Sequence, residues 1–155
     1  MKFRYCTAGI IQNGEKIIIG RRIKGTAPYP DTWFTPGGGV NDFEKAEMLF
    51  KNKDYDNEYL HSELKREMRE ETNIEIKNIR NIVPQYRVVP REAETQNKHG
   101  EMTHYYFLEY LCDYESGELK AGDDAAEVKW VDKSELKNVL LTPPSKEMYK
   151  ELRWL

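Results

Sequence analysis

The residues best able to do chemistry lie in one short run, Arg66-Glu67-Met68-Arg69-Glu70-Glu71. At about 100° per residue, an α-helix brings Glu67, Glu70 and Glu71 to one side. They border an apolar stripe formed by Leu60, Leu64 and Met68. Like charges three or four residues apart repel, and more strongly near a low-dielectric surface. A hard divalent cation such as Mg²⁺ or Mn²⁺ would relieve that repulsion, because it takes carboxylate oxygens as ligands.

The ordinary alternative for such a run is a solvated charged helix. Pairs of Lys65 or Arg66 with nearby glutamates would then stabilise the exposed face. Either way the helix is predicted over 58–72, which is rich in Leu, Glu, Lys, Arg and Met and contains no Gly or Pro. Asp56 or Asn57 can cap its start, and Asn73 can end it in a left-handed conformation.

The remaining elements must position this helix. Strands are predicted over 4–12, 16–22, 33–34, 104–112 and 125–131, with one or two more inside 74–89. Asn13-Gly14 predicts a hairpin, and 33–34 is expected to run into a glycine turn at 37–39. Residues 90–103 are expected to be a polar loop, and a helix should follow Pro143-Pro144. A chain of 155 residues mixing strands and helices predicts one α/β domain with a mixed sheet.

Composition and charge argue against some classes of binding partner. The net charge is −3 with both signs interspersed and no long basic run, so no nucleic-acid partner is expected. Cys6 and Cys112 lie among apolar residues and are expected to be buried and reduced. The first residues lack the apolar run of a signal peptide, and no apolar stretch approaches bilayer length. We therefore expect a cytoplasmic protein without a membrane partner.

The pattern around the acidic run resembles the box of the Nudix (MutT-like) hydrolase family, G-x5-E-x7-R-E-U-x-E-E-x-G-U, where U is a bulky apolar residue. Glu58 stands eight residues before Arg66, and 66–74 fits position by position, with Asn73 in place of the last Gly. Two further segments resemble the family. Residues 33–38 (WFTPGG) are similar to the aromatic-Pro-Gly-Gly segment at the start of the box, and Trp130-Val131 with Glu135-Leu136 are similar to the late strand and helix. The resemblance implies the Nudix fold, an α/β/α sandwich with a mixed β-sheet.

One departure from the family is large. Nineteen residues, 39–57, separate Gly38 from Glu58, where the family has five. The domain at 1–155 is therefore expected to carry an insertion at about 41–57, including a short helix capped at Asn41 with Glu44. Its apolar side chains are expected to pack against the domain edge and to form part of the pocket wall. Packing against a second subunit is the alternative, and a homodimer stays open.

The resemblance also implies roles for individual residues. The metal ligands would be Glu67, Glu70 and Glu71, with the Gly38 backbone near the metal and one further acid among Asp123, Asp124 and Glu127, of which we take Asp124. Arg66 would orient a box glutamate, and Glu58 would anchor the helix start. The general base would be a box glutamate or one of Glu92, Glu94 and Glu101 in the polar loop, although each loop residue alone is better explained by solvation.

Substrate contacts are predicted on both sides of the glycines. Gly37 and Gly38 permit a close backbone approach to the phosphates. The guanidinium groups expected to bind phosphate are Arg21, Arg22, Arg87 and Arg91. Tyr29 is a candidate for stacking on a base, whereas core packing is expected for Trp33 and Phe34. His61, His99 and His104 have no metal-ligand spacing and are expected to be surface or core residues.

The implied activity is Mg²⁺-dependent hydrolysis of a diphosphate linkage in a nucleoside diphosphate derivative. The segment 122–127 before Trp130 is similar to relatives that hydrolyse ADP-ribose and nucleotide sugars, so a substrate of that kind is favoured. A nucleoside triphosphate, oxidised or not, is the first alternative. A non-catalytic nucleotide-binding sensor is the second, and it is disfavoured because all three box glutamates are present.

Overall fold

Two long strands form the axis of the sheet. β1 (Lys2–Asn13) and β7 (Met102–Ser116) run parallel, paired from Lys2↔Thr103 to Gln12↔Asp113. The computed structural model of the chain describes residues 1–23, 29, 31–122 and 125–155. Within these residues six further strands complete the sheet: β2 (Lys16–Arg22), β3 (Trp33–Phe34), β4 (Gly37–Gly39), β5 (Glu75–Asn81), β6 (Arg91–Gln96) and β8 (Ala125–Asp132). The order is β3-β2-β1-β7-β5, with β4 on β1, β6 on β7 and β8 on β2.

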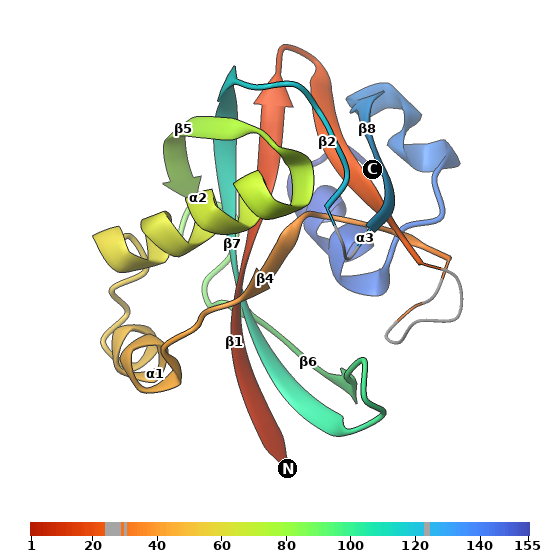
Figure 1. Cartoon of the computed structure of the whole chain (residues 1–155). Helices are drawn as coiled ribbons and strands as arrows, with labels where there is room; N and C mark the ends of the chain where they lie inside the picture. The colour runs from red at the N-terminus through yellow and green to blue at the C-terminus, as the bar shows by residue number, and fades with distance from the viewer. Residues whose placement is uncertain (24–28, 30, 123–124) are drawn as a thin grey trace.

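Helices cover both faces of this sheet (Figure 1). On one side lie α1 (Phe43–Lys51) and α2 (Glu58–Thr72), and on the other the 3-10 helix η1 (Lys133–Asn138) and α3 (Pro143–Glu151). Strand alternation sends neighbouring residues of β1 into separate cores: Ile10 packs with residues of α3, and Ile11 packs with residues of α2. The predicted α/β/α sandwich with a mixed sheet, in a single domain, is confirmed.

The prediction of the acidic helix is confirmed at both ends. α2 spans the predicted residues, and the side chain of Asn57 accepts a hydrogen bond from Tyr59 N at 2.9 Å. Asn73 ends the helix with φ 63°, a left-handed conformation that Asn tolerates. Leu60, Leu64 and Met68 are fully buried beneath the helix. The spacing of apolar residues therefore correctly predicts which side of α2 faces the sheet.

Three local predictions were wrong. Residues 37–39 are a strand, not a turn, because Cys6, Thr7 and Ala8 of β1 pair with them. Residues 91–96, expected in a polar loop, form β6 against β7, since an edge strand tolerates polar residues on its exposed face. The cap of α1 is Asp42, whose side chain accepts from Lys45 N, rather than Asn41.

The insertion packs against the domain edge, as expected. Its helix α1 buries Ala46 and Leu49, and the Phe50 ring lies 4.6 Å from the Tyr5 ring of β1, centroid to centroid. Cys6 and Cys112 are both buried free thiols, as predicted. Among the described residues, no helix is both long enough and apolar enough to cross a membrane.

Two neighbouring substitutions in α2 test this packing. Leu64→Ala should lower the free energy of unfolding by about 2–5 kcal/mol, because it empties a fully buried site in the core. Lys65→Ala, one residue further on the exposed side, should change it by less than about 0.5 kcal/mol. Urea unfolding of both variants measures the difference, and equal effects would contradict the assigned helix face.

Candidate active site

The glutamates of α2 lie directly against the glycine strand. A Cβ added to Gly38 would stand 2.3 Å from Oε2 of Glu67, so only glycine leaves room for this carboxylate. Gly37 N donates a hydrogen bond to Oε2 of Glu71 at 3.4 Å. Glu67 and Glu71 are both buried, each 8% exposed. The close approach of β4 therefore brings backbone and carboxylate oxygens together at one place.

Arg66 holds the carboxylates of this helix in position. Its Nε donates to Glu63 at 2.8 Å, and its Nη1 lies 3.1 Å from an oxygen of Glu67 and 3.1 Å from one of Glu70. One guanidinium thus faces three carboxylates, which leaves an excess of negative charge. Burial raises the pKa of Glu67, and the charge of Glu70 adds to the rise against the lowering effect of Arg66.

Glu63 connects the helix to the start of the insertion. Its Oε1 accepts hydrogen bonds from Asn41 N at 2.8 Å and from the Tyr59 hydroxyl at 2.9 Å, while Oε2 accepts from Arg66. With three donors, this buried carboxylate fixes the chain that leaves β4. The split in the box therefore does not separate the glycine strand from α2.

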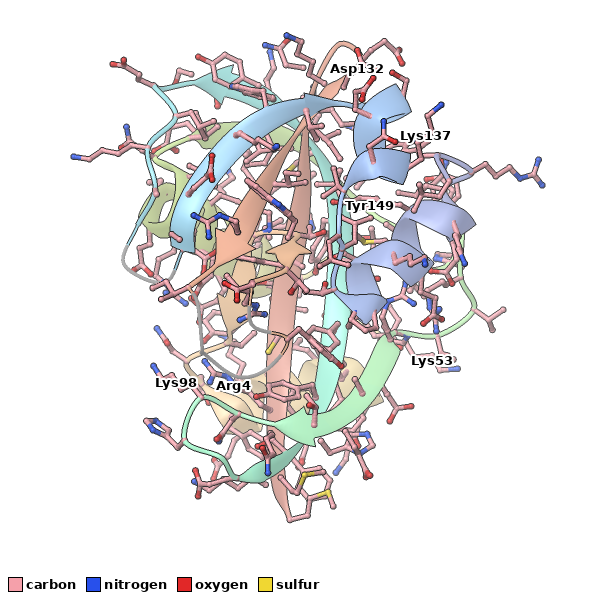
Figure 2. All side chains as sticks on the ribbon, turned by 90° about the vertical axis from the view of Figure 1, so that its right-hand side faces the viewer. Arg4, Lys53, Lys98, Asp132, Lys137 and Tyr149 are labelled. Atoms are coloured by element: carbon pink, nitrogen blue, oxygen red, sulfur yellow. The ribbon has the colours of Figure 1, made fainter. Side chains whose placement is uncertain are left out.

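A cavity of about 340 Å³ opens beside these glutamates. Its lining changes character from one end to the other. At the acidic end lie Glu67, Glu70, Glu71 and the three glycines of β4, with the guanidinium of Arg4 against Gly39. The rest of the lining includes the cations Arg22 and Lys98 and the rings of Tyr29, Phe34, Tyr105 and Phe107. Figure 2 shows Arg4 and Lys98 at the lower left of the sheet. Such a lining suits a ligand with an anionic part and a flat apolar part.

The structure divides the predicted substrate residues into two groups. Arg22, Tyr29, Gly37 and Gly38 line the cavity. Arg21 and Arg87 do not: Arg21, the preceding residue of β2, pairs with Glu127 at 3.1 Å, and Arg87 pairs with glutamates of α3. Strand alternation explains the first case, because neighbouring residues of β2 point to opposite sides.

Several other predicted residues lie away from the cavity. Glu58 is exposed in the first turn of α2, where its charge favours the helix N-terminus. The loop acids offered as general bases are engaged elsewhere, Glu92 and Glu94 with His104 at 2.8 and 3.0 Å, and Glu101 with Lys2. No described residue of 41–57 lines this cavity, whereas Phe50, Lys51 and Tyr55 line a second hollow with residues of β6 and β7, so the expectation that the insertion forms part of the substrate pocket wall stays a prediction. Asp123 and Asp124 lie outside the described residues.

The donor set fits a hard divalent cation. Glu67, Glu70 and Glu71 offer only oxygen, and the glycine strand adds backbone at the same place. Across the described ranges, no three acidic, His or Cys side chains already converge as metal ligands. Glu70 is exposed, so its carboxylate can rotate away from Arg66 toward the other two at little cost. A metal would therefore compete with Arg66 for these oxygens.

Three charged residues of the cavity were missed from the sequence: Arg4, Lys98 and Glu109. Glu109 is the most unusual, because it is 5% exposed and lies between apolar residues of β7. Its two oxygens accept from Arg91 Nε at 3.1 and 3.2 Å. Arg91, expected to bind phosphate, is itself buried and held by Glu109, Glu147 and Glu151. A glutamate inside the run HYYFLEYLC was the available signal.

Comparison with solved structures finds the same fold elsewhere. The chain is similar to a MutT NUDIX hydrolase from Burkholderia pseudomallei, with TM-score 0.64 and 19% identity over 98% of this chain and 99% of that one. A NUDIX hydrolase from Nitrosomonas europaea gives TM-score 0.66 and 16% identity over 98% and 89%. The NUDIX domain of Shewanella oneidensis NrtR, complexed with ADP ribose, gives 0.63 and 14% over 99% and 88%.

The sequence itself matches a family model. No curated protein matches the chain. The model of the NUDIX domain matches residues 61–154, which include the acidic run, the cavity strands β6 and β7, and α3. Since that match covers more than half of the 155 residues, the chain belongs to the Nudix family of hydrolases.

Proposed function

We propose that this chain hydrolyses a diphosphate linkage in a nucleoside diphosphate derivative, with Mg²⁺ or Mn²⁺ held by Glu67, Glu70 and Glu71. The observation that carries the proposal is the position of these glutamates. They meet the glycine strand at the mouth of a cavity that also offers cations and aromatic rings. A diphosphate needs the metal-binding glutamates and the cations, and a nucleoside needs the aromatic rings.

Different parts of the cavity would bind different parts of the substrate. A bound divalent ion would neutralise diphosphate oxygens and lower the pKa of a water molecule. Arg4, Arg22 and Lys98 would bind the remaining phosphate charge, since guanidinium and ammonium groups donate strong hydrogen bonds to phosphate. Arg66 would return to its carboxylate partners whenever the ion leaves, which keeps the ligands oriented.

Among substrates, ADP-ribose or another nucleotide sugar is favoured. The NrtR domain of the same fold is complexed with ADP ribose, and the volume of this cavity is in the range of small-molecule sites. A nucleoside triphosphate, oxidised or not, is the alternative. A binding-only sensor is the second alternative, which the intact Glu67, Glu70 and Glu71 disfavour. The proposal also includes one domain at 1–155 with an insertion at 41–57, and a cytoplasmic location. The expected partner is a small molecule, with neither nucleic acid nor a membrane. Asp124 remains a proposed additional metal ligand.

A panel of substrates tests the activity directly. With millimolar Mg²⁺, release of nucleoside monophosphate or pyrophosphate should exceed background for at least one member of a panel of ADP-ribose, nucleotide sugars and nucleoside triphosphates. The nucleotide sugars should give the highest kcat/KM. Binding without turnover across the whole panel would instead support the sensor.

Glu71→Gln separates chemistry from folding. The substitution removes one ligand charge while keeping volume and an acceptor for Gly37 N. Turnover should fall by more than about 100-fold, with the unfolding transition retained. Glu44→Gln, exposed on α1 and outside the cavity, is the matched control and should keep wild-type turnover. Near wild-type activity in the Glu71→Gln variant would refute the assigned role.

Thermal unfolding reports metal binding without any substrate. Mg²⁺ at about 100 times its Kd should stabilise the folded state by about 2.7 kcal/mol. For a chain of this length that corresponds to a rise in Tm of several degrees. The rise should vanish in EDTA and shrink strongly in Glu67→Gln, because that variant loses a buried ligand. A shift of the same size in the variant would argue for binding elsewhere.

A further inference from the structure

Small and aromatic side chains lie side by side along the floor of the cavity. On β1, Cys6 and Ala8 face the cavity with small side chains, and their partners across the strand pair are Phe107 and Glu109 of β7. The rings of Tyr105 and Phe107 lie 5.6 Å apart, centroid to centroid, and are nearly parallel at 13°. Small residues beside a stack of rings leave a flat space that a planar ring can fill.

Glu109 lies in this floor on β7, two strands across from the glycine strand β4. Glu109 pairs with Ala8 in register, and Ala8 pairs with Gly37. At roughly 4.8 Å per strand, the Glu109 backbone is about 10 Å from the Gly37 backbone. A diphosphate held at Gly37 and Glu71 would therefore leave its nucleoside within reach of Glu109.

The carboxylate of Glu109 has acceptor capacity that the protein does not use. Each carboxylate oxygen has two lone-pair sites. Oε1 faces both Nε and Nη2 of Arg91, at 3.1 and 3.0 Å, whereas among the described residues Oε2 accepts from Nε alone, at 3.2 Å. Burial raises the pKa of Glu109 to about 7 although Arg91 opposes the rise. Further N–H donors from a ligand would therefore stabilise the charged form in this desolvated place.

Arg91 is shared between Glu109 and two glutamates of α3. Arg91 also binds Glu147 and Glu151 of α3, and Arg87 is shared with the same two glutamates. Two guanidinium groups thus serve three carboxylates. The nearby hydroxyls are paired among themselves: Thr35 Oγ1 lies 3.1 Å from Ser145 Oγ and 2.9 Å from the hydroxyl of Tyr149, a residue of α3 that Figure 2 labels.

We propose that Glu109 determines which nucleobase the cavity accepts, by receiving a hydrogen bond from an exocyclic amino group of the base. Adenine and cytosine offer that donor, whereas hypoxanthine and uracil carry a carbonyl oxygen at that position, and their nearest donor is the N–H of the neighbouring ring nitrogen. An oxygen facing a buried carboxylate leaves both acceptors without a donor, which costs more than the loss of one bond. Glu109 is thereby a specificity residue, and the glutamates of α2 carry the chemistry. This inference rests on the proposed nucleotide substrate.

Binding without metal tests the inference separately from hydrolysis. Calorimetric titrations in EDTA would compare ADP with IDP and CDP with UDP, two pairs in which the amino group becomes a carbonyl and the neighbouring ring nitrogen becomes an N–H. In the wild-type protein the amino member of each pair should bind about 10-fold tighter or more. Glu109→Gln should bring each ratio within about 2-fold, because an amide presents either an acceptor or a donor. Glu94→Gln, on the outer side of β6 and outside the cavity, should leave both ratios unchanged.

A second variant covers the case in which Glu109→Gln disturbs Arg91 and the fold. Glu109→Asp keeps the charge on a shorter side chain. It should retain the preference for the amino bases, with a smaller affinity ratio within each pair than the wild-type protein. Equal binding within each pair in the wild-type protein, or unchanged ratios in Glu109→Gln, would overturn the inference. A uniform fall in kcat with unchanged ratios would overturn it too, since it would place Glu109 in catalysis or folding. Discrimination without any hydrolysis would support Glu109 and refute the proposed activity instead.

Discussion

The packing of the α2 carboxylates against the glycine strand is the contact on which the rest of the site depends. A single methyl group on Gly38 would collide with Glu67, at 2.3 Å from its Oε2. That closeness requires β4 to be held flat against β1, and β1 in turn is paired with β7 from Lys2 to Gln12. The sheet is thus the base that sets the distance between the glycine backbone and α2.

Electrostatics would oppose this arrangement if the helix stood alone. Four carboxylates on one side of α2 repel one another, and three of them, Glu63, Glu67 and Glu71, are buried. The apolar stripe beneath them, from Leu60 to Met68, supplies the burial that outweighs the repulsion. Arg66 then reduces the repulsion without removing it. The remaining negative charge would favour a bound cation, as the proposed function requires.

Features that depend on helix periodicity and capping could be predicted from the sequence, whereas strands that form only by pairing with another strand could not. The helix at 58–72 and the left-handed Asn73 follow from periodicity and capping, and both were predicted. The strands β4 and β6 were missed, because glycines and polar residues carry little strand propensity and form strands here only through contact with β1 and β7. Arg22 and Arg21 could not be told apart for the same reason, since their directions follow from the register of β2 with β8.

The same difference separates the two parts of the cavity lining. The acidic end is built from one helix and one strand, so its residue types and spacing are visible as a motif. The opposite end is built from β1, β6, β7 and α3, whose residues meet only after the sheet has formed. Cys6 and Ala8 of β1 pair with Gly39 and Gly37 on one side and with Phe107 and Glu109 on the other, so β1 joins the two parts of the cavity. The acidic part is therefore visible in local sequence, whereas the rest of the lining follows from the register of the sheet.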